Sequence, residues 1–203
     1  MTRGLLVLWF LAGAPVNQEL LDRTLALVGG QPITLGDARA ALALGLIDAG
    51  GSPNPIGETA TRLIRRELIL REVQRYAPAP PSESAVDARL AELRQRFPDQ
   101  AAMDRVLDAN GLTAARLRTW VRDDVRIEAY LVQRFASATA PTDAEIARYY
   151  TQMKPTLDQE GLTTFEQATP RIRERLAELR RSELINDWVT DLQRRTEVVI
   201  LQQ

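Results

Sequence analysis

The stretch TFEQATPRIRERLAELRRSELINDWVTDLQRR, residues 164–195, decides the fold. Its apolar residues recur at steps of three and four with one longer gap, as one face of an α-helix requires. They are Phe165, Ala168, Ile172, Leu176, Leu179, Ile185, Trp188 and Leu192. Thr164 is a suitable N-cap, and Pro170 lies early enough to be tolerated. A helix of this length extends over roughly 45 Å, so other elements must pack along it.

A β-branched run follows this helix directly. Residues 197–201 are Glu-Val-Val-Ile-Leu, which predicts a strand. Its best partner is the run Thr-Leu-Ala-Leu-Val at residues 24–28, which a Gly-Gly turn links to a second short strand at residues 32–34. Pro32 cannot donate to a ladder, which places that second strand at an edge. We therefore predict that the two ends of the chain meet in one small sheet.

The segment between these strands is predicted to be helical, because its apolar residues follow the helical period and its breaks carry capping and turn residues. The expected helices cover residues 36–47, 58–76, 84–97, 101–109, 113–135 and 142–150. Ser84 with Asp87, and Thr142 with Glu145, have the spacing of capping boxes. Residues 153–163 are expected to form a loop. The predicted fold class is mainly α, a multi-helix core with a small antiparallel sheet formed by the N-terminal hairpin and the C-terminal strand.

The first residues have the pattern of an export signal. Arg3 precedes an apolar run at residues 4–11, and Ala12-Gly13-Ala14 has the small-x-small form of a cleavage site. Pro15 directly after Ala14 is unfavourable for cleavage there. Residues 1–16 are interpreted as a signal peptide, with a short N-terminal anchor or a buried first helix as alternatives. The export signal predicts a periplasmic or secreted protein, whose residues 17–203 form one core domain that includes the long C-terminal helix, about residues 164–196.

Composition argues against most enzyme classes. The chain contains no His and no Cys, which removes the usual nucleophile–base pairs and nearly all zinc, haem and iron–sulfur sites. Lys154 is the single lysine and does not stand in a P-loop motif, so nucleotide-driven activity is not expected. The net charge of −1 gives no general attraction to nucleic acid. We expect a non-enzymatic protein without cofactor, metal, nucleotide or nucleic acid.

Several segments, in their order along the chain, resemble the SurA-type periplasmic chaperones and their parvulin-linked relatives. The matching runs are Asp22-Arg23 through Ile33-Thr34, Leu63 through Leu70, Asn110-Gly111-Leu112-Thr113 with Leu117-Arg118, Pro141 through Ile146 with Tyr149-Tyr150, and Phe165 through Ala168 with Ile172-Arg173, Trp188 and Leu192. In this family a parvulin isomerase domain commonly follows the Tyr-Tyr helix. Here only a short segment separates Tyr150 from Phe165. The resemblance therefore implies a SurA-like chaperone core without the isomerase domain.

The resemblance implies an ATP-independent holdase that binds unfolded or partly folded envelope proteins, outer-membrane proteins above all, through an apolar cleft between helices, without prolyl isomerase activity. The alternative is a non-enzymatic assembly or scaffold subunit that binds one specific folded envelope partner. A homodimer is compatible with both functions. A mobile apolar groove would favour the chaperone, whereas a flat patch repeated across a two-fold axis would favour the scaffold.

The candidate client-binding residues are apolar or aromatic side chains expected at the surface. Tyr149, Tyr150 and Met153 stand where the isomerase domain is missing, and packing against the C-terminal helix is the alternative for them. Met103, Val106 and Leu107 on the short helix form the second group, with core packing as the alternative. Trp120 and Trp188 are assigned to the core. Neighbouring carboxylates such as Asp123-Asp124 are assigned to surface ion pairs, because arginines surround them.

Overall fold

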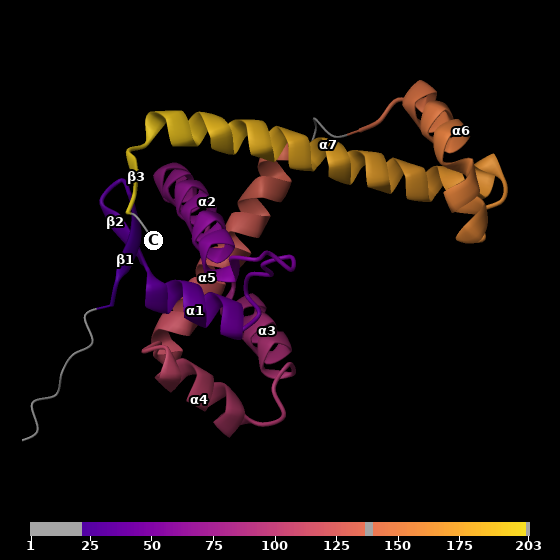
Figure 1. Cartoon of the computed structure of the whole chain (residues 1–203). Coiled ribbons are helices and arrows are strands. Elements are labelled where there is room, and N and C mark those ends of the chain that lie inside the picture. Colours follow the sequence, from indigo (N-terminus) through magenta and orange to yellow (C-terminus); the bar gives the residue numbers. More distant parts are fainter. Residues whose placement is uncertain (1–21, 137–139, 202–203) are drawn as a thin grey trace, which may run out of the picture.

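The computed structural model describes residues 22–136 and 140–201, and within them the chain is mainly helical with one small sheet (Figure 1). The expected signal peptide, its cleavage site at Ala14 and the alternative anchor lie outside the described residues. In chain order the elements are β1 Thr24–Val28, β2 Gln31–Thr34, α1 Leu35–Ala43, α2 Pro55–Tyr76, α3 Glu83–Arg94, α4 Gln100–Ala109, α5 Ala114–Phe135, α6 Asp143–Gln159, α7 Phe165–Arg195 and β3 Val198–Ile200.

The sheet joins the two ends of the sequence, as predicted. Its strand order is β2-β1-β3, and both pairings are antiparallel. In the second pairing Leu27 lies opposite Val199. Gly29 and Gly30 have positive φ angles of 54° and 85°, which the tight turn between β1 and β2 requires and which glycine adopts without strain. β2 carries Pro32 and is an edge strand, also as predicted.

Helix α2 is the centre of the main core. It contacts α1, α5, α7 and both strands of the hairpin. Its buried residues include Leu68 and Val73, which pack with Val28 of β1 and Trp188 of α7. The assignment of Trp188 to the core is confirmed, whereas Trp120 is only partly buried, between the main core and a second cluster.

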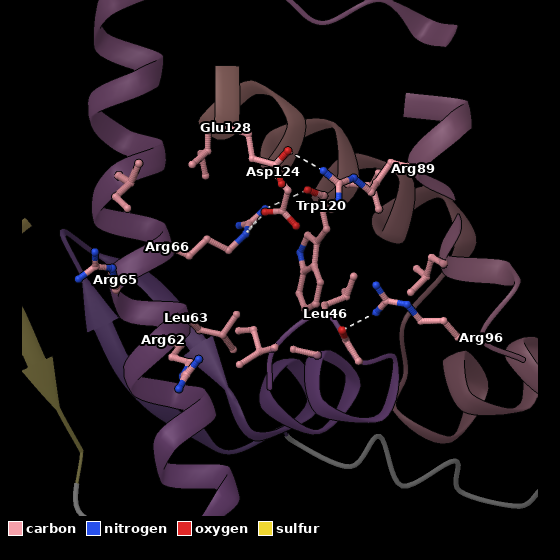
Figure 2. Close-up of a pocket in the computed structure, with 17 residues that line it drawn as sticks. Leu46, Arg62, Leu63, Arg65, Arg66, Arg89, Arg96, Trp120, Asp124 and Glu128 are labelled. Atoms are coloured by element: carbon pink, nitrogen blue, oxygen red, sulfur yellow. Dashed lines mark hydrogen bonds and ion pairs between the residues drawn. The ribbon is translucent and has the colours of Figure 1, made fainter. Parts of the chain in front are cut away.

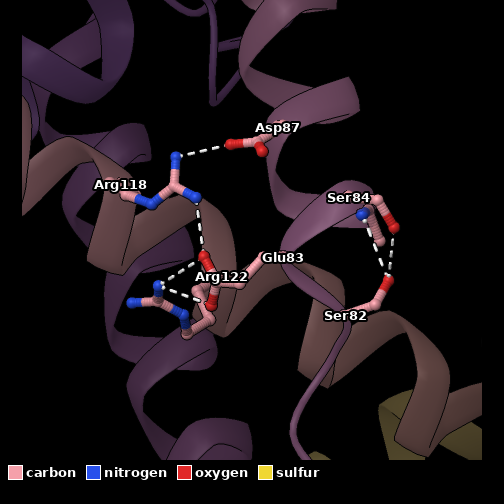
Figure 3. A network of polar contacts seen from close by, with 7 residues as sticks. Ser82, Glu83, Ser84, Asp87, Arg118 and Arg122 are labelled. Atoms are coloured by element: carbon pink, nitrogen blue, oxygen red, sulfur yellow. Dashed lines mark hydrogen bonds and ion pairs between the residues drawn. The ribbon is translucent and has the colours of Figure 1, made fainter.

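The second cluster joins α1, α3, α4 and α5, and a network of charged side chains closes it at the surface (Figure 3). Glu83 at the start of α3 accepts hydrogen bonds from Arg118 at 2.6 Å and from Arg122 at 3.0 Å, both on α5. These two guanidinium groups, Arg118 first, lower the pKa of Glu83 below its usual value. The N-cap of α3 is Ser82 rather than the predicted Ser84, because the helix begins at Glu83, one residue before Ser84.

Helix α6 and the first part of α7 form a third, separate cluster, which projects away from the other helices (Figure 1). Its buried members are Ile146, Leu157, Ala168 and Ile172. We call α6 with residues 165–176 the arm, and the remaining described residues the body. α7 connects the two without a break, since its 31 residues extend over about 46 Å.

Leu179 lies between the two clusters on α7. The periodicity placed it on the buried face, but its side chain is 55% exposed. The prediction failed because the helix continues from one packed cluster to another, and the apolar stripe is left uncovered in between.

The predicted loop at residues 153–163 is wrong. α6 continues to Gln159 with Pro155 inside it, and only a short connection precedes α7. Two interactions offset the hydrogen bond that Pro155 cannot make: Leu157 is fully buried against α7, and Lys154 Nζ bonds Asp158 Oδ1 at 2.8 Å. Helix α1 is shorter than predicted, because Gly45 has a φ of 64° and turns the chain away.

Candidate functional site

An open pocket of about 330 Å³ lies in the body, bordered by α2, α3, α5 and the turn after α1 (Figure 2). We call it the α2–α5 pocket. Apolar side chains from all four elements form most of its lining, namely Leu46, Ile47, Leu63, Ile69, Leu93, Trp120 and Ile127. The pocket can therefore shield an apolar side chain of a ligand from water.

Helical spacing brings the pocket residues together. On α2, Arg62, Arg66 and Ile69 are separated by four and three positions, so they lie on one face. Trp120 and Asp124 are four positions apart on α5 and face them across the pocket (Figure 2). Each helix thus contributes both charged and apolar groups to its own side of the pocket.

A salt bridge at the centre of the pocket fixes the position of Trp120. Arg66 donates from Nε to Asp124 Oδ1 at 2.6 Å and from Nη2 to the Trp120 carbonyl at 3.0 Å. The same guanidinium lies 6.0 Å from the centre of the Trp120 ring. Because both charged groups are partly shielded from solvent, this pair holds α2 and α5 together more firmly than an exposed ion pair would.

The turn after α1 closes one end of the pocket. The positive φ of Gly45 directs Leu46 and Ile47 into the lining. Arg96, which follows α3, donates to the Gly45 carbonyl at 2.6 Å and holds the turn in place. The chain direction that glycine permits therefore supplies two apolar lining residues.

Arginines predominate at the rim of the pocket, and three of them already pair with carboxylates. Five arginines line it against two carboxylates; these residues are Arg62, Arg65, Arg66, Arg89, Arg96, Asp124 and Glu128. Arg65 is the one arginine among them that makes no ion pair or hydrogen bond with another described residue, and partial burial lowers the pKa of its guanidinium. Charge and lining together suit a ligand that carries an apolar side chain close to a carboxylate.

The carboxylates in and beside the pocket lie close to arginines. Asp124 and Glu128 are each bonded to an arginine, Arg66 and Arg89 respectively. Burial raises the pKa of the neighbouring Asp123, although the charge of Arg66 opposes this effect. Within residues 22–136 and 140–201, no cluster of three or more potential metal ligands occurs.

Tyr149, Tyr150 and Met153 come together in the arm on α6, which projects away from α2 and α5 (Figure 1). All three are half-buried and pack at the margin of the arm cluster. Tyr150 donates from its hydroxyl to the Thr163 carbonyl at 3.1 Å, and its ring meets Phe165 edge-on with 5.3 Å between centroids. The structure therefore combines the two alternatives for these residues, since they pack against α7 and still keep exposed area.

Met103, Val106 and Leu107 do not form an exposed group. Met103 and Leu107 are 3% and 4% exposed, and Val106 is half-buried. The expected exposure was wrong because α4 is amphipathic: Met103 and Leu107 lie four positions apart and belong to the second cluster, which also contains residues of α1 and α5.

The α2–α5 pocket was not predicted from the sequence. Arg65 and Arg66 resemble other surface arginines in the sequence, and Trp120 was assigned to the core. One signal was present: arginines at positions 62, 65 and 66 flank Leu63 and Ile64, which lie on the apolar face of a predicted helix. An arginine that borders an apolar stripe lies at the junction of core and solvent, which is where pockets open.

Comparisons of this chain with protein-family models and with curated proteins find no match. The likeness to SurA-type chaperones therefore stays a prediction from the sequence. Of the helices in the part of the chain that the structure describes, none combines the length and the apolar character needed to cross a membrane.

Proposed function

We propose that the protein is an ATP-independent holdase chaperone of the bacterial envelope, periplasmic or secreted, which binds unfolded or partly folded client proteins without catalysis. The observation that carries the proposal is the α2–α5 pocket, which is open, apolar at its centre and rich in arginine at its rim. The order of sequence segments supports the class of client, since the chaperones that these segments resemble act on envelope and outer-membrane proteins.

The energetics of the pocket fit reversible binding. Burial of one large apolar side chain contributes roughly 1.5–3 kcal/mol, and the cost of ordering the client offsets part of this gain. A single occupied pocket therefore gives weak binding that a folding client can leave. The arginines of the rim keep the surface around the pocket hydrated and attract clients with acidic residues.

The arm supplies a second contact in this proposal. Tyr149, Tyr150 and Met153 present partly exposed aromatic and thioether groups at a distance from the pocket. A long unfolded client can reach both places at once, and two weak contacts on one chain hold it longer than either alone. Methionine suits this role because it adapts its shape to different ligands.

The test is suppression of aggregation. A chemically unfolded β-barrel membrane protein is diluted with and without the chaperone, no nucleotide is added, and light scattering is followed. We expect suppression near stoichiometric amounts for several clients. Leu46→Asp places a charge in the apolar lining and should weaken the effect, whereas Leu179→Asp, an exposed apolar position outside the pocket, is the matched control. Absence of suppression across several clients would overturn the proposal.

The alternative function, a scaffold subunit for one folded partner, draws on exposed apolar side chains outside the pocket. Val132 on α5 and Leu179 on α7 are 54% and 55% exposed. Capture of one stoichiometric folded partner from an envelope extract, lost in a Val132→Asp, Leu179→Asp double variant and retained in Leu46→Asp, would favour the scaffold.

A further inference from the structure

The outer edge of β3 offers unpaired backbone groups. The Glu197 carbonyl accepts from the Gly29 amide at 2.8 Å, and the Leu201 amide donates to the Leu25 carbonyl at 2.9 Å. Because hydrogen-bonding direction alternates along an antiparallel strand, Val198 and Ile200 direct their N–H and C=O groups away from β1. No strand among residues 22–136 and 140–201 pairs with this side of β3.

The two edges of the sheet differ in how well they are protected against pairing with a further strand. On the β2 edge, Pro32 removes a donor and discourages further pairing. On the β3 edge, the residues are Val-Val-Ile, which favour strands, and Ile200 is 66% exposed. Proteins normally block such an edge, so an edge that stays open and apolar indicates a place where another strand adds.

A groove of about 600 Å³ borders this edge, between α2 and α7. Apolar residues from three elements line it: Ile64 and Leu68 of α2, Val189 of α7, and Ile200 of β3. The opposite wall is polar and uncharged, because Asn186, Thr190 and Gln193 follow one face of α7 at steps of four and three. Val198 also packs toward the main core, so alternate side chains of a strand added to β3 would lie on the groove side.

The charges of the groove define its ligand further. Glu58 and Arg62 neutralise each other through a 2.8 Å ion pair. Arg65 also lines the groove and has no carboxylate partner among the described residues, which leaves one positive charge. A carboxylate on the ligand would complement this charge.

We propose that the β3 edge and the groove between α2 and α7 bind an extended peptide segment by strand addition, with alternate apolar side chains in the groove and an acidic residue near Arg65. The occupant is a segment of unfolded β-type protein rather than a second copy of this chain. This binding site shares Arg62 and Arg65 with the α2–α5 pocket but has a different apolar lining, and it does not require holdase activity. The strand-addition proposal and the holdase proposal can therefore fail in experiment independently of each other.

The first experiment measures amide hydrogen exchange by NMR on the full chain. The probe is the synthetic peptide acetyl-Thr-Val-Thr-Val-Glu-Val-Thr-Val-amide. In the free protein we expect fast exchange at Val198 and Ile200 and slow exchange at Leu201, whose amide already bonds β1. A saturating amount of peptide should slow exchange at Val198 and Ile200 by at least about tenfold, because their outward groups become hydrogen-bonded. The Leu46→Asp variant should show the same protection, which separates this site from the pocket.

The second experiment compares two variants at one position. Ile200→Pro removes the outward donor without removing a bond to β1, since proline is tolerated on an edge strand. It should weaken peptide binding roughly two- to tenfold, the effect of one lost hydrogen bond. Ile200→Val keeps the donor and the strand propensity and should bind within about twofold of the native chain.

Two results would overturn the proposal. In the first, the peptide binds while exchange at Val198 and Ile200 stays unchanged. In the second, the protein sediments as a dimer with those amides protected before any peptide is added, which would assign the edge to self-association.

Discussion

Replacement of Leu157 by alanine should unfold the arm and leave the body folded. Leu157 is fully buried and is one of the four buried members of the arm cluster. A buried Leu→Ala change removes about 3–5 kcal/mol, because it combines lost transfer energy with the cavity left behind. A cluster with four buried members has a small free energy of unfolding, so we expect this loss to exceed it. None of its members belongs to the main core. We therefore expect the change to act locally.

The tryptophans make this effect measurable. Trp120 and Trp188 both lie in the body, so in a chain whose third tryptophan, Trp9, is replaced by phenylalanine the fluorescence reports on the body, whereas far-UV circular dichroism reports on every helix. In Leu157→Ala the helical dichroism signal should begin to decrease at a lower urea concentration than the one at which the tryptophan fluorescence changes. In the matched control Leu68→Ala, a 2% exposed position in the main core, the fluorescence transition itself should move to lower urea. Coincident transitions in Leu157→Ala would refute the reasoning, since they would mean that α7 couples arm and body into one cooperative unit.

Three further predictions concern charged groups of the body. Arg66→Met leaves the partly buried Asp124 unpaired and should lower the free energy of unfolding by about 1–3 kcal/mol in urea titrations. The matched change Arg62→Met breaks an exposed pair and should cost less than about 1 kcal/mol; equal losses would contradict the assigned role of the buried pair. Burial raises the pKa of Glu67, so the folded state holds this proton to higher pH than the unfolded chain does. Stability should therefore fall as the pH rises from the ordinary glutamate pKa of about 4.3 to the raised pKa of Glu67 in the folded state. Glu67→Gln should reduce this fall in melting temperature, measured by thermal melts across that pH range. An unchanged pH profile in Glu67→Gln would contradict this role of Glu67. Asp37→Ala removes the buried half of the capping box of α1 and should cost about 1–2 kcal/mol in the same urea titrations, and a neutral result would show that the cap is dispensable.

The sheet and most helices could be predicted because each is specified by local pattern. The predicted caps Thr142 and Thr164 are the N-caps of α6 and α7, which begin directly after them. The β-branched run at the end of α7 predicted β3, and the run at residues 24–28 was predicted as its partner, which is β1.

The errors arise where tertiary packing overrides local signals. Pro155 and the polar residues around it predicted a loop, yet the burial of Leu157 under α7 keeps α6 helical through them. Leu179 follows the buried period of α7 but lies where no other cluster reaches. The sequence shows the period of a helix and does not show how far its partners extend along it.

The candidate sites were harder to predict for a different reason. The α2–α5 pocket depends on the relative position of four elements, and the distance of 58 residues between Arg66 and Asp124 gives no sign of their contact. The β3 edge could have been suspected, since a strand at one end of a three-stranded sheet has one free side. Its groove could not, because it depends on how α7 crosses α2.

The pairing of β1 with β3 also constrains the order of folding. Ala26 and Ile200 are 174 positions apart in the sequence but are partners in the sheet. During synthesis the hairpin β1–β2 emerges long before β3, so one edge of β1 has no partner for most of that time. The buried residues of β1 are completely packed only after α7, which comes after the arm in the sequence, has docked on the body. Contacts of this range slow folding and prolong the exposure of apolar surface. Until β3 pairs with β1, the chain is partly unfolded and β1 has an open edge. In that state it has the same character as the unfolded β-type segments that it is proposed to bind.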